Sequence, residues 1–541
     1  MDSLPTEILG LILQWEVRMC ERHKNTIVQH RLVCKAFDLA LRAFAFKTVQ
    51  LEFSRFLRHE ATPDPDSLSS VGAICEAIHL DLMVVRDEEE ISRLSSVFQG
   101  LLSKVPEMSP LLDSLRRYCM NENTFDETDF RTVVERVVWS TPNLRRLKLN
   151  LPFQVVGQTS RTATILLATT LACIARRPEE HITLETMVLD HVSDTSVVDI
   201  CNNPMDVINA VRVFEGLKHL VLQIKRQETL QASQITFSDN LWFLIEKASH
   251  LESLCLIGWN VRRNIKTRRH CHNVAYNHWI MRSLPFHRDI SSKLTHLRFL
   301  ELKRVDIRAR SFVSLMRQIA PSLKELYLNQ VYLKVRAPHA LPQGPDLWIG
   351  GVGRKGEEAF WIAEDLRAST ELKLDILRVT GLGYDDFRAF PDPEYPTYDF
   401  EDPTSQNRCF DQRFVDAVIK GLDPFAPVVE PATPSPHGPP HDALPESVDL
   451  GGLLEHTQIS SSGSDTARRR DWDAETFQSY HNPTSEFKRS LDGFFTNHNE
   501  RALKELQNII TVADRGMMLL SAEIDRARDE GAIATQLAGN T

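Results

Sequence analysis

Apolar residues recur at helical spacing in two short segments at the amino end of the chain. In the segment SLPTEILGLILQ they predict a helix from Pro5 to Gln14. In the segment RLVCKAFDLALRAFAFKTVQL, a broad apolar stripe predicts a second helix from Arg31 to Phe44. Helices confined to about 50 residues bury too little apolar surface for robust independent stability. We therefore expect a partner, or the rest of the chain, to cover their exposed face.

A different pattern, L-x-x-L-x-L, recurs through the middle of the chain. Its alternation of apolar and polar positions predicts short strands with one apolar face. Seven copies follow in order, beginning at Leu144, Leu184, Leu217, Leu251, Leu297, Leu323 and Leu374, and AIHLDLM from Ala77 to Met83 is a degraded earlier copy. Successive copies start 26 to 51 residues apart, mostly further than the roughly 20–29 residues of a regular leucine-rich repeat.

The segments between the copies have the length and apolar content of helices. Examples are TATILLATTLACIARR (residues 162–177) and RSFVSLMRQIAPS (residues 310–322). One strand and one covering helix per unit predict an α/β fold in which neighbouring units stack into an irregular, curved leucine-rich-repeat solenoid. The alternative left open by the pattern is a set of scattered strands in an ordinary α/β domain.

The composition changes after the last copy. Residues 423–445 carry eight prolines and a serine-rich run follows, which predicts a disordered linker over residues 423–470. Residues 471–541 regain apolar density and are expected to contain a long amphipathic helix starting near Asn499. Its apolar stripe is formed by Leu503, Leu506, Ile509, Ile510, Met517, Leu520 and Ile524. We expect this stripe to cap the final repeat of the solenoid.

Composition and charge narrow the choice of function. With 541 residues, 42% of them hydrophobic and 25% charged, the chain is an ordinary globular protein of more than one domain or one repeat array with an attachment. A net charge of −10 argues against nucleic acid as the partner.

Nine scattered cysteines without a CxxC pair fit a reducing compartment. No cationic region precedes an apolar run at the start, and the most apolar stretch, residues 163–175, is too short to cross a membrane. An intracellular location, cytoplasmic or nuclear, is expected.

The residues that might carry chemistry give no coherent site. His270, Cys271, His272 and His278 lie close together, but their spacing matches no familiar zinc motif. The cationic run at residues 262–269 fits a solvated loop, and the glycine-rich run at residues 350–356 lacks the ending of a phosphate-binding loop. No catalytic motif is present. We expect no metal, no cofactor and no enzymatic activity.

The two amino-terminal segments together resemble an F-box, the helical module by which substrate receptors dock on the Skp-type adaptor of SCF ubiquitin ligases. The order "LPTEIL…I" and then "RLVCKAF", with Phe46 closing the motif, carries the resemblance, which covers under a tenth of the chain. The connection between the blocks, residues 15–30, is longer and more charged than in the family. The residues that the resemblance assigns to adaptor binding are Leu4, Pro5, Ile8, Ile12, Leu32, Val33, Cys34 and Phe37. The layout of box, degenerate repeats and tail is similar to that of F-box proteins of filamentous fungi.

The resemblance implies a four-part organisation and a non-catalytic function. Residues 1–52 would form the F-box, 70–422 the solenoid, 423–470 the linker and 471–541 the carboxy-terminal segment. The box would bind the adaptor and the solenoid an unknown target protein. In the alternative, the chain is a solenoid scaffold unrelated to ubiquitin, and its amino-terminal helices cap the first repeat. Exposure of the apolar face around Leu4 and Ile8 distinguishes the two interpretations.

Overall fold

The structure is a computed structural model that describes much of the chain up to Val418. The described residues are 5–19, 24–52, 70–83, 87–104, 126–152, 161–225, 231–259, 294–334, 347–348 and 360–380, with single residues between and after these ranges. The expected linker and the carboxy-terminal apolar stripe lie outside the described residues, as do the His270 group, residues 262–269 and the glycines at 350–356.

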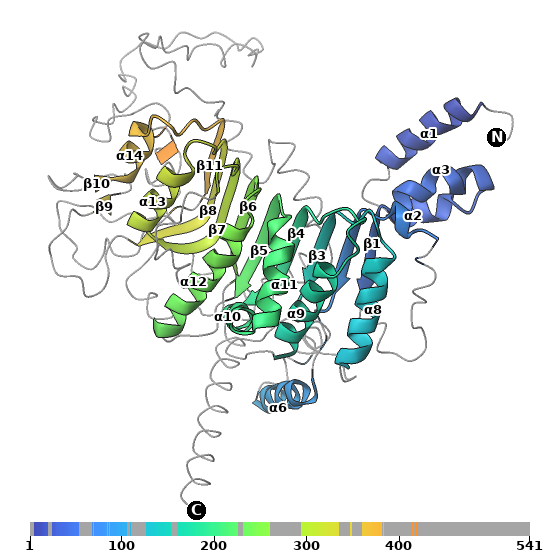
Figure 1. Cartoon of the computed structure of the whole chain (residues 1–541), viewed down its shortest axis with the longest axis horizontal. Helices are drawn as coiled ribbons and strands as arrows, with labels where there is room; N and C mark the ends of the chain where they lie inside the picture. Colours follow the sequence, from blue (N-terminus) through green and yellow to red (C-terminus); the bar gives the residue numbers. More distant parts are fainter. Residues whose placement is uncertain are drawn as a thin grey trace, which may run out of the picture.

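A parallel sheet of nine strands organises the molecule, and its strands follow one another in chain order (Figure 1). They are β1 (Thr48–Glu52), β2 (Ala77–Asp81), β3 (Arg146–Asn150), β4 (Thr186–Ser193), β5 (His219–Lys225), β6 (Ser253–Trp259), β7 (Phe299–Arg308), β8 (Glu325–Lys334) and β11 (Ile376–Thr380). Two further short strands, β9 (Leu347–Trp348) and β10 (Phe360–Trp361), pair with each other. The predicted α/β fold class is confirmed.

Every L-x-x-L-x-L copy forms a strand, and the copies share one register. Leu220 pairs with Leu254, which pairs in turn with Leu300. Because side chains alternate along a strand, the second and third apolar positions of each copy point to the same face, which we call the leucine face. These leucines are 0–3% exposed from β3 to β8. The degraded copy is β2 and continues the register, and β1, which the pattern did not predict, extends it by one more strand.

Helices cover the leucine face of the sheet (Figure 1). The predicted helix at residues 162–177 is α9 (Arg161–Ala175), and that at residues 310–322 is α13 (Ala309–Ile319). The same layer holds α8 (Glu127–Trp139), α10 (Asp194–Asn202), α11 (Pro204–Glu215), α12 (Gln231–Lys247) and α14 (Ile362–Ala368); α6 is Glu88–Lys104 and the 3-10 turn η1 is Gly72–Ile74. The apolar residues of α8 to α14 and the leucine rows form one continuous core, to which no described residue of α6 or η1 contributes.

A repeated hydrogen-bond pattern fixes where each strand begins. The carbonyl of Lys47 accepts bonds from the amides of Glu76 and Ala77 at 2.9 and 3.0 Å, and the carbonyl of Glu76 accepts from the next strand in the same way. The series of accepting residues is Lys47, Glu76, Arg145, Glu185, Lys218, Glu252, Arg298 and Lys324. Their charges alternate up to Arg298, and Lys218 pairs with Glu185 at 2.8 Å. Because such exposed pairs contribute about 0–1 kcal/mol each, the backbone and the leucines set most of the register.

The amino-terminal helices differ in their bounds from the prediction. The first helix, α1, spans Thr6–Met19 and is five residues longer than expected at its carboxyl end. The connection that follows it contains a short helix, α2 (Lys24–His30). The third helix, α3, spans Lys35–Phe46. The predicted start at Arg31 is wrong because Cys34, at the N-cap position directly before α3, has an extended backbone with φ −162° and ψ 169°.

The first edge of the sheet has a helical neighbour. At the β1 edge, α3 packs against β1 and η1. Beyond β11 in the chain, Phe414, Val415 and Val418 are 0–8% exposed and belong to the main core. The expectation that the stripe from Leu503 to Ile524 caps the final repeat concerns residues outside the described part of the chain and stays a prediction.

Candidate protein-docking face

The helix α1 is apolar on two sides. Its inner stripe, Leu9 and Leu13, packs with Phe37 and Leu41 of α3 in a small core that is separate from the core of the sheet. Its outer stripe recurs at the same helical spacing and consists of Ile8, Leu11, Ile12, Trp15 and Met19, which are 45–82% exposed. A helix that is apolar all round is normally buried on all sides, whereas the outer stripe of α1 is largely exposed to solvent.

Exposed apolar side chains concentrate on this part of the molecule. Among the described residues, ten of the fourteen large apolar side chains that are exposed lie between residues 5 and 46. Single exposed apolar residues need no explanation, but a contiguous group marks an interaction site. The helices α1 to α3 therefore present the strongest candidate for protein docking in the described part of the chain.

The turn between α2 and α3 adds two apolar residues to this surface. Leu32 is 85% and Val33 63% exposed. Arg31 holds the turn in place: its guanidinium donates to Asp38 Oδ1 at 2.8 Å from Nε and at 2.5 Å from Nη2. The same guanidinium lies 4.4 Å from the centre of the Phe46 ring. These contacts preorganise the turn, so that little conformational entropy is lost when a partner binds.

A second arginine strengthens the same cluster. Arg42 donates to the other carboxylate oxygen of Asp38 at 2.7 Å. These hydrogen bonds to Arg31 and Arg42 hold the pKa of Asp38 below its ordinary value. His30 and Glu16 lie 3.1 Å apart and join α2 to α1. We define the docking face as the outer stripe of α1 with Leu32 and Val33.

The eight residues that sequence reasoning assigned to docking fall into three groups. Pro5, Ile8, Ile12, Leu32 and Val33 are exposed. Phe37 is 9% exposed and belongs to the small core, with Cys34 packed against it, and Leu4 lies outside the described residues. Sequence reasoning missed the inner stripe, Leu9 and Leu13. Their spacing of four residues was the signal in the sequence that could have revealed it.

Helix α3, against which α1 packs, is joined to the sheet by a single residue. Phe46 ends α3 and Thr48 begins β1, so only Lys47 separates them. The Lys47 carbonyl accepts the first pair of strand-entry hydrogen bonds, and its ammonium lies 3.2 Å from the Glu76 carboxylate. A partner on the docking face would therefore be held at a defined position relative to the sheet.

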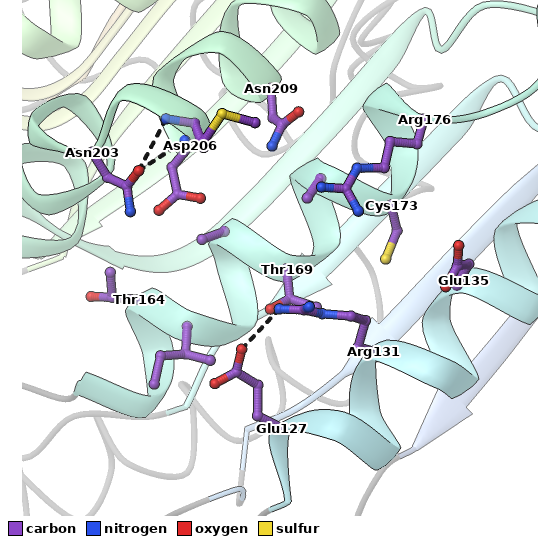
Figure 2. Close-up of a pocket in the computed structure, with 14 residues that line it drawn as sticks. Glu127, Arg131, Glu135, Thr164, Thr169, Cys173, Arg176, Asn203, Asp206 and Asn209 are labelled. Carbon is purple, nitrogen blue, oxygen red and sulfur yellow. Dashed lines mark hydrogen bonds and ion pairs between the residues drawn. The ribbon is translucent and has the colours of Figure 1, made fainter.

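A cavity of about 360 Å³ lies on the helical layer, between α8, α9 and α11. Figure 2 shows the residues that line it. Asn203 caps α11 by accepting from the amide of Met205 at 3.0 Å, and Arg131 donates to Glu127 at 3.0 Å. Small residues of α9, Ala168 and Ala172, leave the space between the neighbouring helices.

The chemistry of this cavity does not favour catalysis. Burial, reinforced by the charge of Glu135, raises the pKa of the Cys173 thiol to about 11, and the nucleophile in thiol chemistry is the thiolate. Burial also raises the pKa of Asp206. Among the residues that line the cavity, no nucleophilic side chain is paired with a neighbouring base that would activate it. The cavity is better described as a groove between packed helices.

The face of the sheet opposite the helices, which we call the second face, carries a buried row of its own. Lys148 and Asp190 form an ion pair at 3.5 Å, with side chains 0% and 2% exposed. Next to them a second apolar cluster crosses five strands. It consists of Val188, Val221, Cys255, Phe299 and Tyr327.

Two searches of the described residues concern other kinds of site. No three histidine, cysteine, aspartate or glutamate side chains in the described part of the chain gather in a way that would hold a metal ion. Within the same ranges, no helix combines the length and the apolar character that crossing a membrane requires.

Comparison with known proteins adds no assignment. No protein-family model matches the chain, and no curated protein sequence matches it. The case for a function therefore rests on the residues and geometry described above.

Proposed function

We propose that this chain is the substrate-recognition subunit of an SCF-type ubiquitin ligase. Its helices α1 to α3 act as an F-box that docks on the Skp-type adaptor, and the rest of the chain holds a target protein. The observation that carries the proposal is the docking face. The inner stripe of α1 is buried against Phe37 and Leu41, while its outer stripe exposes five large apolar residues.

The proposal includes a leucine-rich-repeat solenoid as the target-binding part. Three features support it: strands that follow in chain order, leucines in a common register, and helices on one face. Repeats of this kind bury their apolar faces only by stacking on neighbours. The unequal distances between the copies then correspond to insertions between the strand and helix of some units.

The mechanism of such a receptor is proximity. The adaptor would hold the chain by its docking face, and the single-residue link at Lys47 would place the target at a fixed distance from it. Holding a target near a separate enzyme raises the effective concentration of its lysines without any chemistry on the receptor. Ubiquitin transfer would occur on other subunits, and no cofactor, metal, membrane or nucleic acid enters this account.

One observation favours a second candidate function. Helix α3 packs against β1 and η1 and so closes the first edge of the sheet. A scaffold that has no connection with ubiquitin would need its amino-terminal helices for that purpose alone. This candidate accounts for the inner contacts of α3 but leaves the outer stripe of α1 unexplained, which is why we rank it second.

Co-purification of the full chain with a purified Skp-type adaptor tests the proposal. Ile8→Asp combined with Ile12→Asp places two charges on the outer stripe, outside the small core, and is expected to abolish co-purification. Met205→Asp combined with Ile208→Asp is the matched control, because these α11 residues are 59% and 55% exposed and lie away from the docking face.

Each outcome has a defined meaning. Binding by wild type and control but not by the Ile8 and Ile12 variant supports the F-box. Absence of binding by the wild-type chain contradicts it and favours the scaffold. Equal binding by all three proteins shows that the adaptor uses another surface. Circular dichroism of each variant establishes that the helices remain folded.

A further inference from the structure

The groove between α8, α9 and α11 has a floor of small residues. Thr164, Ala168 and Ala172 follow one another at intervals of four residues on α9, so they lie on one side of that helix. Their short side chains leave about 360 Å³ between the longer side chains of the two neighbouring helices (Figure 2). This volume lies within the range of sites that bind a small molecule or a short stretch of another chain.

Two nearly buried polar side chains line this groove. Asn209 of α11 is 8% exposed, and Figure 2 shows it directed towards α9. Its carboxamide makes no hydrogen bond in the described part of the chain, and neither does the hydroxyl of Thr169, which is 5% exposed on α9. Because buried polar groups in folded proteins are normally hydrogen-bonded, two such groups at one groove indicate a place where a bound molecule supplies the partners.

One end of the groove has a carboxylate that favours a cation. Arg131 donates to Glu127 at 3.0 Å, so these two side chains already have each other as partners. The half-buried carboxylate of Asp206 accepts no hydrogen bond from the described residues. Burial raises its pKa, and the opposite charges of Arg131 and Glu127 act on it as well. A bound cation would replace the water that this carboxylate has lost.

The second arginine of the groove belongs to its other end. Figure 2 shows Arg176 beside Cys173 and away from Asp206. Besides burial, Glu135 and Arg176 are among the charges that act on the pKa of Cys173, whereas neither acts on that of Asp206. Arg176 is also exposed to solvent, where its charge is screened. The end around Asp206 therefore remains suited to a positively charged group.

An extended peptide matches the polar groups of this groove. The carboxamide of Asn209 has a donor and an acceptor, as a peptide group does, so it can bond to a main chain that leaves both groups free. A helix does not, because it uses these groups internally. The floor from Thr164 to Cys173 is about 14 Å long at a rise of about 1.5 Å per residue, which accommodates about four residues of extended chain at about 3.3 Å each.

We infer that the groove between α8, α9 and α11 binds an extended peptide segment of another protein. Asn209 bonds to the main chain of this segment, and Asp206 pairs with a lysine or arginine side chain. Met205 and Ile165, which also line the groove, contact the apolar part of that side chain. The inference does not depend on the proposed function, because the groove and the docking face are formed by different helices.

Selection from a phage-displayed library of random heptapeptides on the full chain tests the inference. The selected peptides are expected to carry lysine or arginine, and fluorescent synthetic copies are expected to bind the full chain in fluorescence polarisation. Asn209→Leu keeps the approximate size of the side chain and removes its hydrogen-bonding groups, and Asp206→Asn removes the charge. Each substitution is expected to weaken the affinity for these peptides at least tenfold.

A matched control and a stability measurement separate binding from folding. Asp199→Asn changes an aspartate of α10 whose pKa is also raised by burial but which does not line the groove, and it is expected to leave the affinity unchanged. Because the Asn209 carboxamide has no partner among the described residues, Asn209→Leu is expected to keep or raise the midpoint of thermal unfolding while it weakens peptide binding.

Three results would overturn the inference. The first is a selection that yields no peptide able to bind the full chain. The second is that every selected peptide binds the Asn209→Leu and Asp206→Asn variants as tightly as the wild-type chain, which would place the binding elsewhere. The third is a lowered unfolding midpoint in Asn209→Leu, which would show that the carboxamide already has a partner in the free protein.

Discussion

The sheet and the amino-terminal helices use the same apolar residue types in opposite ways. In the sheet, each leucine of the repeated pattern lies between two others in register and under a helix, so that Leu254 is 0% exposed. In α1, leucines and isoleucines occupy both sides of one helix, and Ile12 is 47% exposed. Stacked units supply their own neighbours, whereas a small helical module must obtain its last neighbour from elsewhere. This difference in burial is the basis on which we propose a docking face on α1.

The largest expected effect comes from truncating a leucine of the sheet. Leu254→Ala removes buried methyl groups between Leu220 and Leu300 and is expected to lower the free energy of unfolding by about 2–5 kcal/mol. Ile12→Ala on the docking face is expected to change it by no more than about 0.5 kcal/mol. Urea unfolding of both variants measures the contrast. Equal losses would show that Ile12 is buried in solution and would remove the case for a docking face.

A smaller and more local effect is expected from the core of the helical module. Leu41 is 0% exposed and contacts the inner stripe of α1. Leu41→Ala is expected to destabilise α1 to α3 by about 2 kcal/mol, at the lower end for such a change because a small core can relax around the cavity. Hydrogen exchange should increase in α1 and α3 and stay unchanged in β5. An equal increase in β5 would mean that the two cores unfold as one unit.

The smallest expected effect is a difference in acid sensitivity between the two regions. Burial lowers the pKa of His219 in β5 below 6.5, so the unfolded chain binds a proton there before the folded chain does, and folding stability is lost as the pH falls below 6.5. The lowered pKa of Asp38, caused by its hydrogen bonds to Arg31 and Arg42, acts in the same direction but over a more acidic range. Its contribution is full above the ordinary value of 3.8 and is lost only as the pH falls through the lowered pKa.

Acidification from pH 7 to pH 5 should therefore weaken the sheet and leave the Asp38 cluster intact. His219→Gln is expected to reduce the loss of stability over this range, and His250→Gln, at an exposed position, serves as its control. An NMR titration of the Asp38 carboxylate checks the module. A midpoint at or above 3.8 would show that the contacts of Arg31 and Arg42 are not maintained in solution.

Sequence reasoning anticipated the strands better than the surfaces. The L-x-x-L-x-L pattern predicted β3 to β8 and β11 because alternation is a direct consequence of strand geometry. Sequence reasoning missed the second apolar cluster on the opposite face of the sheet, because the prediction considered only the leucine positions and not the residues between them. Val188, Val221 and Cys255 occupy those positions and form a second apolar row. Residues that are apolar on both faces of a strand are the signal that would have revealed it.

The docking face shows why a helical stripe alone is ambiguous. Both Ile8 and Leu9 belong to apolar series in α1, and periodicity cannot tell which series faces α3. The structure settles this through Leu41, which packs on the series of Leu9. The exposure of Leu32 and Val33 was equally beyond the sequence, because it follows from the early end of α2 and the extended backbone at Cys34.

The most direct test of the central claim is titration calorimetry of the full chain with a Skp-type adaptor. The proposal predicts binding with a negative heat-capacity change, since the partner would bury the outer stripe of α1. Ile8→Ala combined with Ile12→Ala should weaken the affinity by at least tenfold, while Met205→Ala combined with Ile208→Ala should not change it. The absence of binding by the wild-type chain, or an affinity unaffected by the Ile8 and Ile12 substitutions, would contradict the proposed function.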